Sequence, residues 1–181
     1  MEISVKFKKT VFAALALATL PLLAPAAAHA DSPQARVLEL RDACDKTSWE
    51  AEFPGLCTKA TGSVSLSEFR EELADGGDGA WWIRQRAITL DQGDTIASKN
   101  VGGIIHSFTE VDQFGKGCVD EWNQAVKETV NNCDPVKDPG IFGTFVPAGT
   151  SSAPQTLPVG VHKFQCLIHP WMRSTVTVKA S

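Results

Sequence analysis

Three potential metal ligands lie close together near the end of the sequence, each three residues from the next. Cys166 offers a thiolate, His169 an imidazole and Met172 a thioether. Thiolate and thioether are soft ligands that select copper, and an imidazole suits copper as well. Two histidines, one cysteine and a long bond to methionine make the trigonal site of electron-transfer blue-copper centres. The spacing therefore predicts a copper site that needs a second histidine from elsewhere in the chain.

Only three histidines lie beyond residue 30, so the second histidine ligand can be sought by elimination. His162 precedes Cys166 by four residues on one expected strand, which places it roughly 13 Å away at about 3.3 Å per residue. An extended strand therefore keeps His162 out of the site, and we expect it to be structural. His106 remains, just after a glycine turn that opens onto a short expected strand. The predicted ligands of one copper ion are His106, Cys166, His169 and Met172.

The same residues leave other kinds of site open. Cys166 alone could be a buried structural thiol, and another group could take the axial position given to Met172. Structural zinc sites use four cysteine or histidine ligands, among which methionine would be unusual. A Cys–His nucleophile pair is conceivable, although no third residue that orients the base can be named. A catalytic second copper centre would need several more histidines than His162, so no enzyme activity is expected.

Two strands must position the metal-binding loop. The residues up to Cys166 have a strand pattern, and the alternation of valine and threonine over residues 175–178 predicts a second strand after the loop. Strand patterns begin at Trp81 and continue to Lys99 across a turn at residues 91–94. Trp81 and Trp82 could bind a partner, but we expect at least one of them to be buried.

Helical patterns occur before and between these strands. Residues 33–45 have the composition of a short helix, and Ser65 with Glu68 forms a capping box for a helix over residues 66–74. Residues 120–130 repeat apolar side chains at helical spacing. A straight helix from Cys118 to Cys133 would separate their Cα atoms by about 22 Å, far beyond disulfide range. We therefore expect a shorter helix there.

All five cysteines lie beyond residue 30, and an odd number in an oxidising compartment leaves one thiol to explain. If Cys166 binds a metal, the other four can pair. Three pairings are possible. We prefer the two local ones, Cys44 with Cys57 and Cys118 with Cys133, because each brackets a turn-rich segment.

The first thirty residues have the pattern of a cleaved signal peptide, with three lysines, a short apolar run and a small-residue cleavage site ending at Ala30. The apolar run is too short for a membrane span. Removing this segment takes three lysines and one glutamate from a formal charge of −4 and leaves −6. That charge argues against nucleic-acid binding. We expect a periplasmic or secreted monomer.

The loop Cys166-x-x-His169-Pro170-x-Met172-Arg173 resembles the copper loop of cupredoxins of the plastocyanin and amicyanin group. Residues 90–106, with a Gly-Asp-Thr turn, an asparagine and then His106, resemble the same group's first-ligand region. The resemblance covers roughly residues 80–111 and 157–181. In that family, the residue at the position of Ser107 bonds toward the cysteine loop.

This resemblance implies a mainly β fold, a Greek-key β-sandwich. We expect it over residues 80–181, with a long, partly helical insertion at 112–156 and an N-terminal helical extension at 31–79. It also implies an exported type 1 blue-copper protein that carries single electrons. A redox protein partner would dock near His169, whose ring edge would lie at an apolar surface beside Pro170 and Trp171. The alternative function is a periplasmic copper carrier without a redox partner.

Overall fold

The computed structural model describes residues 32–180, which form a mainly β structure, as the sequence predicted. The predicted signal peptide lies outside the described residues. The strands and helices, including three short 3₁₀ helices (η), are β1 (Ala35–Arg41), α1 (Lys46–Glu52), α2 (Leu66–Glu72), η1 (Leu73–Asp75), β2 (Trp82–Ile83), β3 (Ala87–Asp91), β4 (Thr95–Asn100), β5 (His106–Ser107), β6 (Thr109–Val111), η2 (Glu121–Ala125), η3 (Ile141–Thr144), β7 (Phe145–Val146), β8 (Gln155–Thr156), β9 (Gly160–Gln165) and β10 (Arg173–Lys179).

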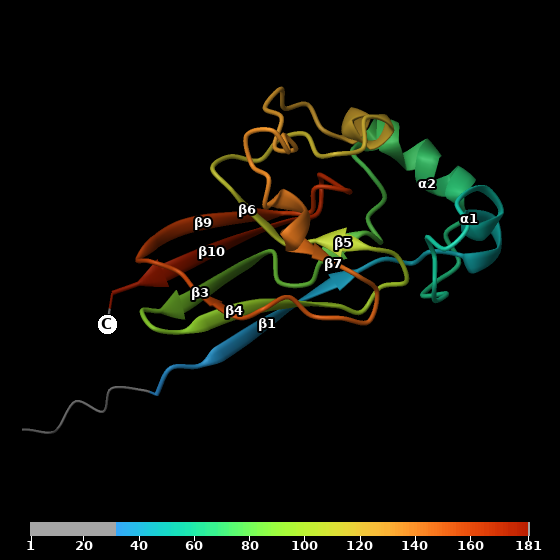
Figure 1. Cartoon of the computed structure of the whole chain (residues 1–181). Coiled ribbons are helices and arrows are strands. Elements are labelled where there is room, and N and C mark those ends of the chain that lie inside the picture. The colour runs from blue at the N-terminus through green and yellow to red at the C-terminus, as the bar shows by residue number, and fades with distance from the viewer. Residues whose placement is uncertain (1–31, 181) are drawn as a thin grey trace, which may run out of the picture. The chain divides into compact units, whose positions relative to one another are not determined.

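Two mixed four-stranded sheets build the sandwich, in the orders β2-β1-β4-β8 and β3-β10-β9-β6. In Figure 1, β1 lies beside β4, and β10 lies beside β9. β1 runs parallel to β4 and β10 runs parallel to β3, while the other neighbours are antiparallel. Buried side chains from both sheets join one core, among them Leu40 and Ile96 from the first sheet and Phe164 and Val176 from the second. The predicted β-sandwich is confirmed.

The predicted helix over residues 33–45 is wrong, because Ala35–Arg41 is strand β1. Six of its residues pair in parallel register with β4. Leu38 and Leu40 are buried while Val37 is half exposed, which is the two-residue period of a strand. Three apolar residues in so short a segment fit both the helical period and the strand period, so the sequence alone does not distinguish them. Pairing with β4 makes the segment a strand. The N-terminal segment thus belongs to the sheet as well as supplying helices.

The second predicted helix of this segment is present as α2, which continues into η1. Its capping box is formed: Ser65 Oγ accepts a bond from the Glu68 backbone N–H, and the Glu68 carboxylate accepts one from the Ser65 backbone N–H. Phe69 and Leu73 are fully buried.

No helix within residues 32–180 has the length and apolar character to cross a membrane.

Both predicted disulfides are present, Cys44–Cys57 and Cys118–Cys133. The Cα atoms of Cys118 and Cys133 lie 5.0 Å apart, so the chain between them must turn back. The only helical residues between them are the five of η2, which confirms the shorter helix. Cys166 is buried and is the free cysteine of the described chain, as the pairing argument required.

His162 has a structural role away from the predicted site. Its Nδ1 lies 2.6 Å from Glu110 Oε1 and its Nε2 lies 2.8 Å from the Pro158 carbonyl oxygen. Glu110, which had no role in the sequence interpretation, is therefore an ion-pair partner. Burial lowers the pKa of His162, but the bonds to Glu110 and Pro158 outweigh burial and raise this pKa above its ordinary value.

We expect this ion pair to make stability pH-dependent. Because the folded pKa of His162 is raised, the pair stabilises fully below the unfolded pKa of about 6.5, and the effect is lost as pH rises through the folded pKa. Glu110→Gln should therefore lower the melting temperature more at about pH 5.5 than at about pH 8.5. Thermal unfolding at both pH values tests this. An equal loss at both would contradict it.

Candidate metal centre

His106, Cys166 and His169 offer three ligand atoms within 4.8 Å of one another, and all three side chains are buried. The two Nδ1 atoms lie 3.2 Å apart. Cys166 Sγ lies 3.9 Å from His106 Nδ1 and 3.6 Å from His169 Nδ1. A metal bonded at about 2.0–2.3 Å to two nitrogens and one sulfur would space them about 3.3–3.8 Å apart. The three donor atoms therefore face a common point and fit one transition-metal ion.

Backbone hydrogen bonds hold the potential ligands of the loop of residues 166–172, between β9 and β10, in place. The Cys166 N–H donates to the Met172 carbonyl, and the Met172 N–H donates to the His169 carbonyl. The Cys166 sulfur also accepts a hydrogen bond from the His169 backbone N–H at 3.4 Å. These bonds close the loop into a turn, so that two potential ligands from one short segment face the same point.

Ser107 joins this loop to the strand that carries His106. Its backbone N–H donates to Cys166 Sγ at 3.3 Å, and its Oγ accepts from the Leu167 N–H at 2.7 Å. The family resemblance implied a contact between Ser107 and the cysteine loop, and these two hydrogen bonds make that contact. β5 itself is anchored by pairing with β7, in which His106 lies opposite Val146.

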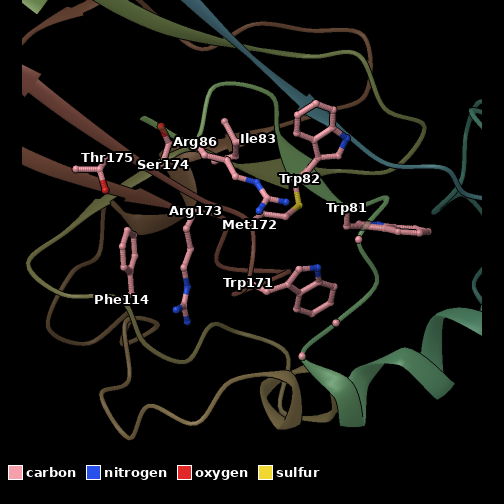
Figure 2. A pocket seen from close by; sticks show the side chains of 13 residues that line it. Trp81, Trp82, Ile83, Arg86, Phe114, Trp171, Met172, Arg173, Ser174 and Thr175 are labelled. Atoms are coloured by element: carbon pink, nitrogen blue, oxygen red, sulfur yellow. The ribbon is translucent and has the colours of Figure 1, made fainter. Parts of the chain in front are cut away.

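Met172 is 1% exposed and lies at the end of the same loop. Its side chain also lines a pocket of about 400 Å³, together with aromatic and arginine side chains that include Trp82, Trp171, Arg86 and Arg173 (Figure 2).

Arg173 had no role in the sequence interpretation. Its guanidinium bonds both carboxylate oxygens of Glu128 and the Pro170 carbonyl. That network fixes the point where the loop enters β10.

An aspartate completes the surroundings of His106. Asp42, directly after β1, has its Oδ2 3.0 Å from His106 Nε2, the ring nitrogen that faces away from Cys166. Both side chains are fully buried. The sequence interpretation missed Asp42 because it lies 64 residues from His106 in the chain. The Gly102-Gly103 pair was a usable signal, because it marks a close approach of the backbone to another segment just before His106.

Charges at the site favour the metal-binding form of the cysteine. Burial raises the pKa of Cys166, but hydrogen bonds from His106 and His169 hold it well below its ordinary value. Burial lowers the pKa of His106, yet Asp42 and Cys166 outweigh it and raise this pKa to about 9. Burial lowers the pKa of His169. The thiolate is the form that binds metals, and a metal entering the site must displace the proton from His106 Nδ1.

The expectation that the edge of His169 lies at the surface is wrong, because its side chain is 0% exposed. An aromatic layer, which comprises Phe69, Trp81, Trp122 and Trp171, covers the ring. Trp122 stacks on His169 with ring centroids 4.7 Å apart and planes inclined by 17°. Phe69 comes from α2 and Trp122 from η2, so the N-terminal helix and the insertion together close the site. A partner therefore cannot touch His169 directly.

Comparisons with known proteins found similar chains among solved structures. No family model matches the chain, and no curated protein matches it. A purple cupredoxin from Nitrosopumilus maritimus is 15% identical with a TM-score of 0.41, covering 79% of this chain and 98% of its own. Amicyanin from Paracoccus versutus is 18% identical with a TM-score of 0.33, covering 54% and 72%. An amicyanin variant with Cu(I) is 13% identical, with a TM-score of 0.35, covering 54% and 73%. These are cupredoxins, the family that the loop motif resembles.

Proposed function

We propose that His106, Cys166, His169 and Met172 hold one type 1 copper ion and that the protein carries single electrons between redox partners. The convergence of two imidazole nitrogens and one thiolate sulfur on one buried point carries this proposal. A cysteine, two histidines and a methionine form the donor set of blue-copper sites. When bound, copper supplies the one-electron chemistry.

The protein's own residues keep this site rigid and dry. Backbone N–H groups of Ser107 and His169 donate to the Cys166 sulfur, so its position is fixed from two sides. The aromatic layer excludes water from His169. A site that is held in this way needs little rearrangement when the charge of the metal changes, and outer partners of this kind also tune the metal.

The arrangement of Cys166, His106 and Asp42 also resembles a Cys–His–Asp catalytic constellation, with the orienting residue that the sequence interpretation could not name. Burial argues against that use. All three side chains are fully buried, and no substrate can reach the sulfur in this conformation. Electron transfer needs no such contact, so the geometry favours it over nucleophilic catalysis. Zinc remains the competing metal, although a methionine ligand would be unusual for it.

Burial also favours electron transfer over copper carriage. A carrier must hand its metal to another protein, which requires a ligand that the acceptor can reach. His106, Cys166 and His169 are each 0% exposed. We therefore propose that the metal stays in place and that the electron crosses the aromatic layer to a docked protein. The two disulfides fit the oxidising compartment expected for an exported protein.

Visible absorption and electron paramagnetic resonance of residues 31–181, produced in the periplasm and loaded with Cu(II), test the proposal. An intense thiolate-to-copper band with a small copper hyperfine splitting is the expected result. A colourless protein that binds zinc, or no metal, would overturn it.

A further inference from the structure

Asp42 is the one carboxylate among the described residues that bonds a predicted ligand, and it is held from several sides. Its oxygens accept hydrogen bonds from the backbone N–H groups of Cys44, Gly103 and Ile104. The hydroxyl of Thr61 donates to it as well. A Cβ on Gly102 would lie 1.9 Å from Asp42 Oδ2, so only glycine lets this backbone approach so closely. The hydrogen-bond donors and the close backbone around Asp42 are therefore suited to a buried, ionised carboxylate.

The donors around Asp42 hold it as an anion. Its oxygens face backbone N–H groups and the Thr61 hydroxyl, and hydrogen bonds donated to a carboxylate stabilise its ionised form. An ionised carboxylate only accepts hydrogen bonds. The 3.0 Å contact to His106 Nε2 therefore requires a proton on Nε2. Because Asp42 keeps the proton on Nε2, Nδ1, the atom that faces Cys166 and His169, is the nitrogen that loses its proton when a metal binds.

Asp42 also places a negative charge near the proposed metal position, which His106 Nδ1, Cys166 Sγ and His169 Nδ1 face. Only the imidazole ring of His106 lies between them. The Cys166 thiolate supplies another negative charge. In a buried site, an additional anion attracts Cu(II) more strongly than Cu(I), because the divalent ion carries the larger charge. The aromatic layer keeps water, which would screen this attraction, away from the other side of the site.

We propose that Asp42 is a positioning residue that fixes the metal-binding nitrogen of His106 and biases the site toward Cu(II). This inference rests on the proposed copper function and deepens it. Carboxylate partners of ligating histidines act in this way at other metal sites, and their removal typically changes metal affinity by about 10–100-fold.

The claim that Asp42 fixes the metal-binding nitrogen of His106, the orientation part of the proposal, can be tested on the wild-type protein, with and without a metal. Nitrogen-15 NMR of the histidine side chains should show a proton on His106 Nε2 that exchanges slowly and resonates far downfield, both in the metal-free protein and in the Cu(I) protein. A His106 Nε2 without a proton would overturn the inference. The metal-free measurement needs no copper, so it still decides the orientation if the copper function proves wrong.

The claim that the charge of Asp42 favours Cu(II), the charge part of the proposal, requires a variant. Asp42→Asn keeps the shape of the side chain and removes its charge. Competition with Cu(I) and Cu(II) chelators should show that Cu(II) affinity falls by about 10–100-fold and Cu(I) affinity falls less, so that the ratio of Cu(II) affinity to Cu(I) affinity decreases. Asp94→Asn is the matched control. It removes the same charge from an exposed turn, where Asp94 accepts bonds from the Gln34 and Asp91 N–H groups.

The ratio should change less than about twofold in Asp94→Asn, because solvent screens that position. An unchanged ratio in Asp42→Asn, in a protein that keeps the thiolate-to-copper band, would overturn the charge part alone. A wild-type protein without that band would instead overturn the proposed function. If Asp42→Asn does not fold, the wild-type NMR measurement decides the inference.

Discussion

Replacing Cys166 with serine is expected to abolish the intense visible band of the Cu(II) protein. The band requires a thiolate bonded to Cu(II), and Cys166 is the free cysteine of the described chain. A serine hydroxyl is a harder ligand that stays protonated at neutral pH, so copper affinity should fall as well. Absorption titration with Cu(II) gives both quantities. An unchanged spectrum in Cys166→Ser would refute the ligand assignment.

A matched control separates ligand loss from damage to the fold. Ser174→Ala removes a buried hydroxyl from β10, just beyond the loop, where it donates to the Gln85 carbonyl at 2.6 Å. This variant should lose stability by about 1–3 kcal/mol and keep the visible band. Near-ultraviolet circular dichroism of both metal-free variants checks that the aromatic core is intact.

Replacing Phe69 with alanine is expected to cause a large loss of stability. Phe69 is 0% exposed and lies among Trp49, Trp81, Trp122 and Trp171, with ring centroids 4.7–5.7 Å away. Truncating a buried phenylalanine to alanine costs about 3–5 kcal/mol through lost transfer free energy and the cavity left behind. Urea unfolding of the metal-free protein measures this loss. Phe69→Leu, which fills most of the volume, should lose clearly less.

The same pair of variants tests whether the aromatic layer closes the site. Phe69 also packs edge-on against His169, with centroids 6.1 Å apart. Phe69→Ala should speed the transfer of Cu(I) to an external chelator at least about tenfold, whereas Phe69→Leu should stay near the wild-type rate. Equal rates in all three proteins would show that copper leaves by another route. The proposed role of the layer would then be wrong.

The residue types and spacing of the loop determined the predicted metal chemistry by themselves. Cys166, His169 and Met172 lie within seven residues, so a single turn suffices to gather them and little depends on the rest of the fold. The disulfides were predictable for the same reason, because each pair is close in sequence. His106 followed by elimination, since few histidines were available.

Only the tertiary structure decided the surroundings of these predicted ligands. Residues 35–41 fit a helix or a strand until pairing with β4 makes them β1, and that pairing brings Asp42 to His106. Likewise, Phe69 and Trp122 cover His169 although they lie far from it in the chain. Contacts between distant segments depend on how the whole chain packs. A local pattern such as Gly102-Gly103 can indicate a close approach, but it does not identify the residue that approaches. Spacing and elimination thus sufficed to propose the four ligands, whereas the charge beside His106 and the aromatic layer over His169 could not be predicted in this way.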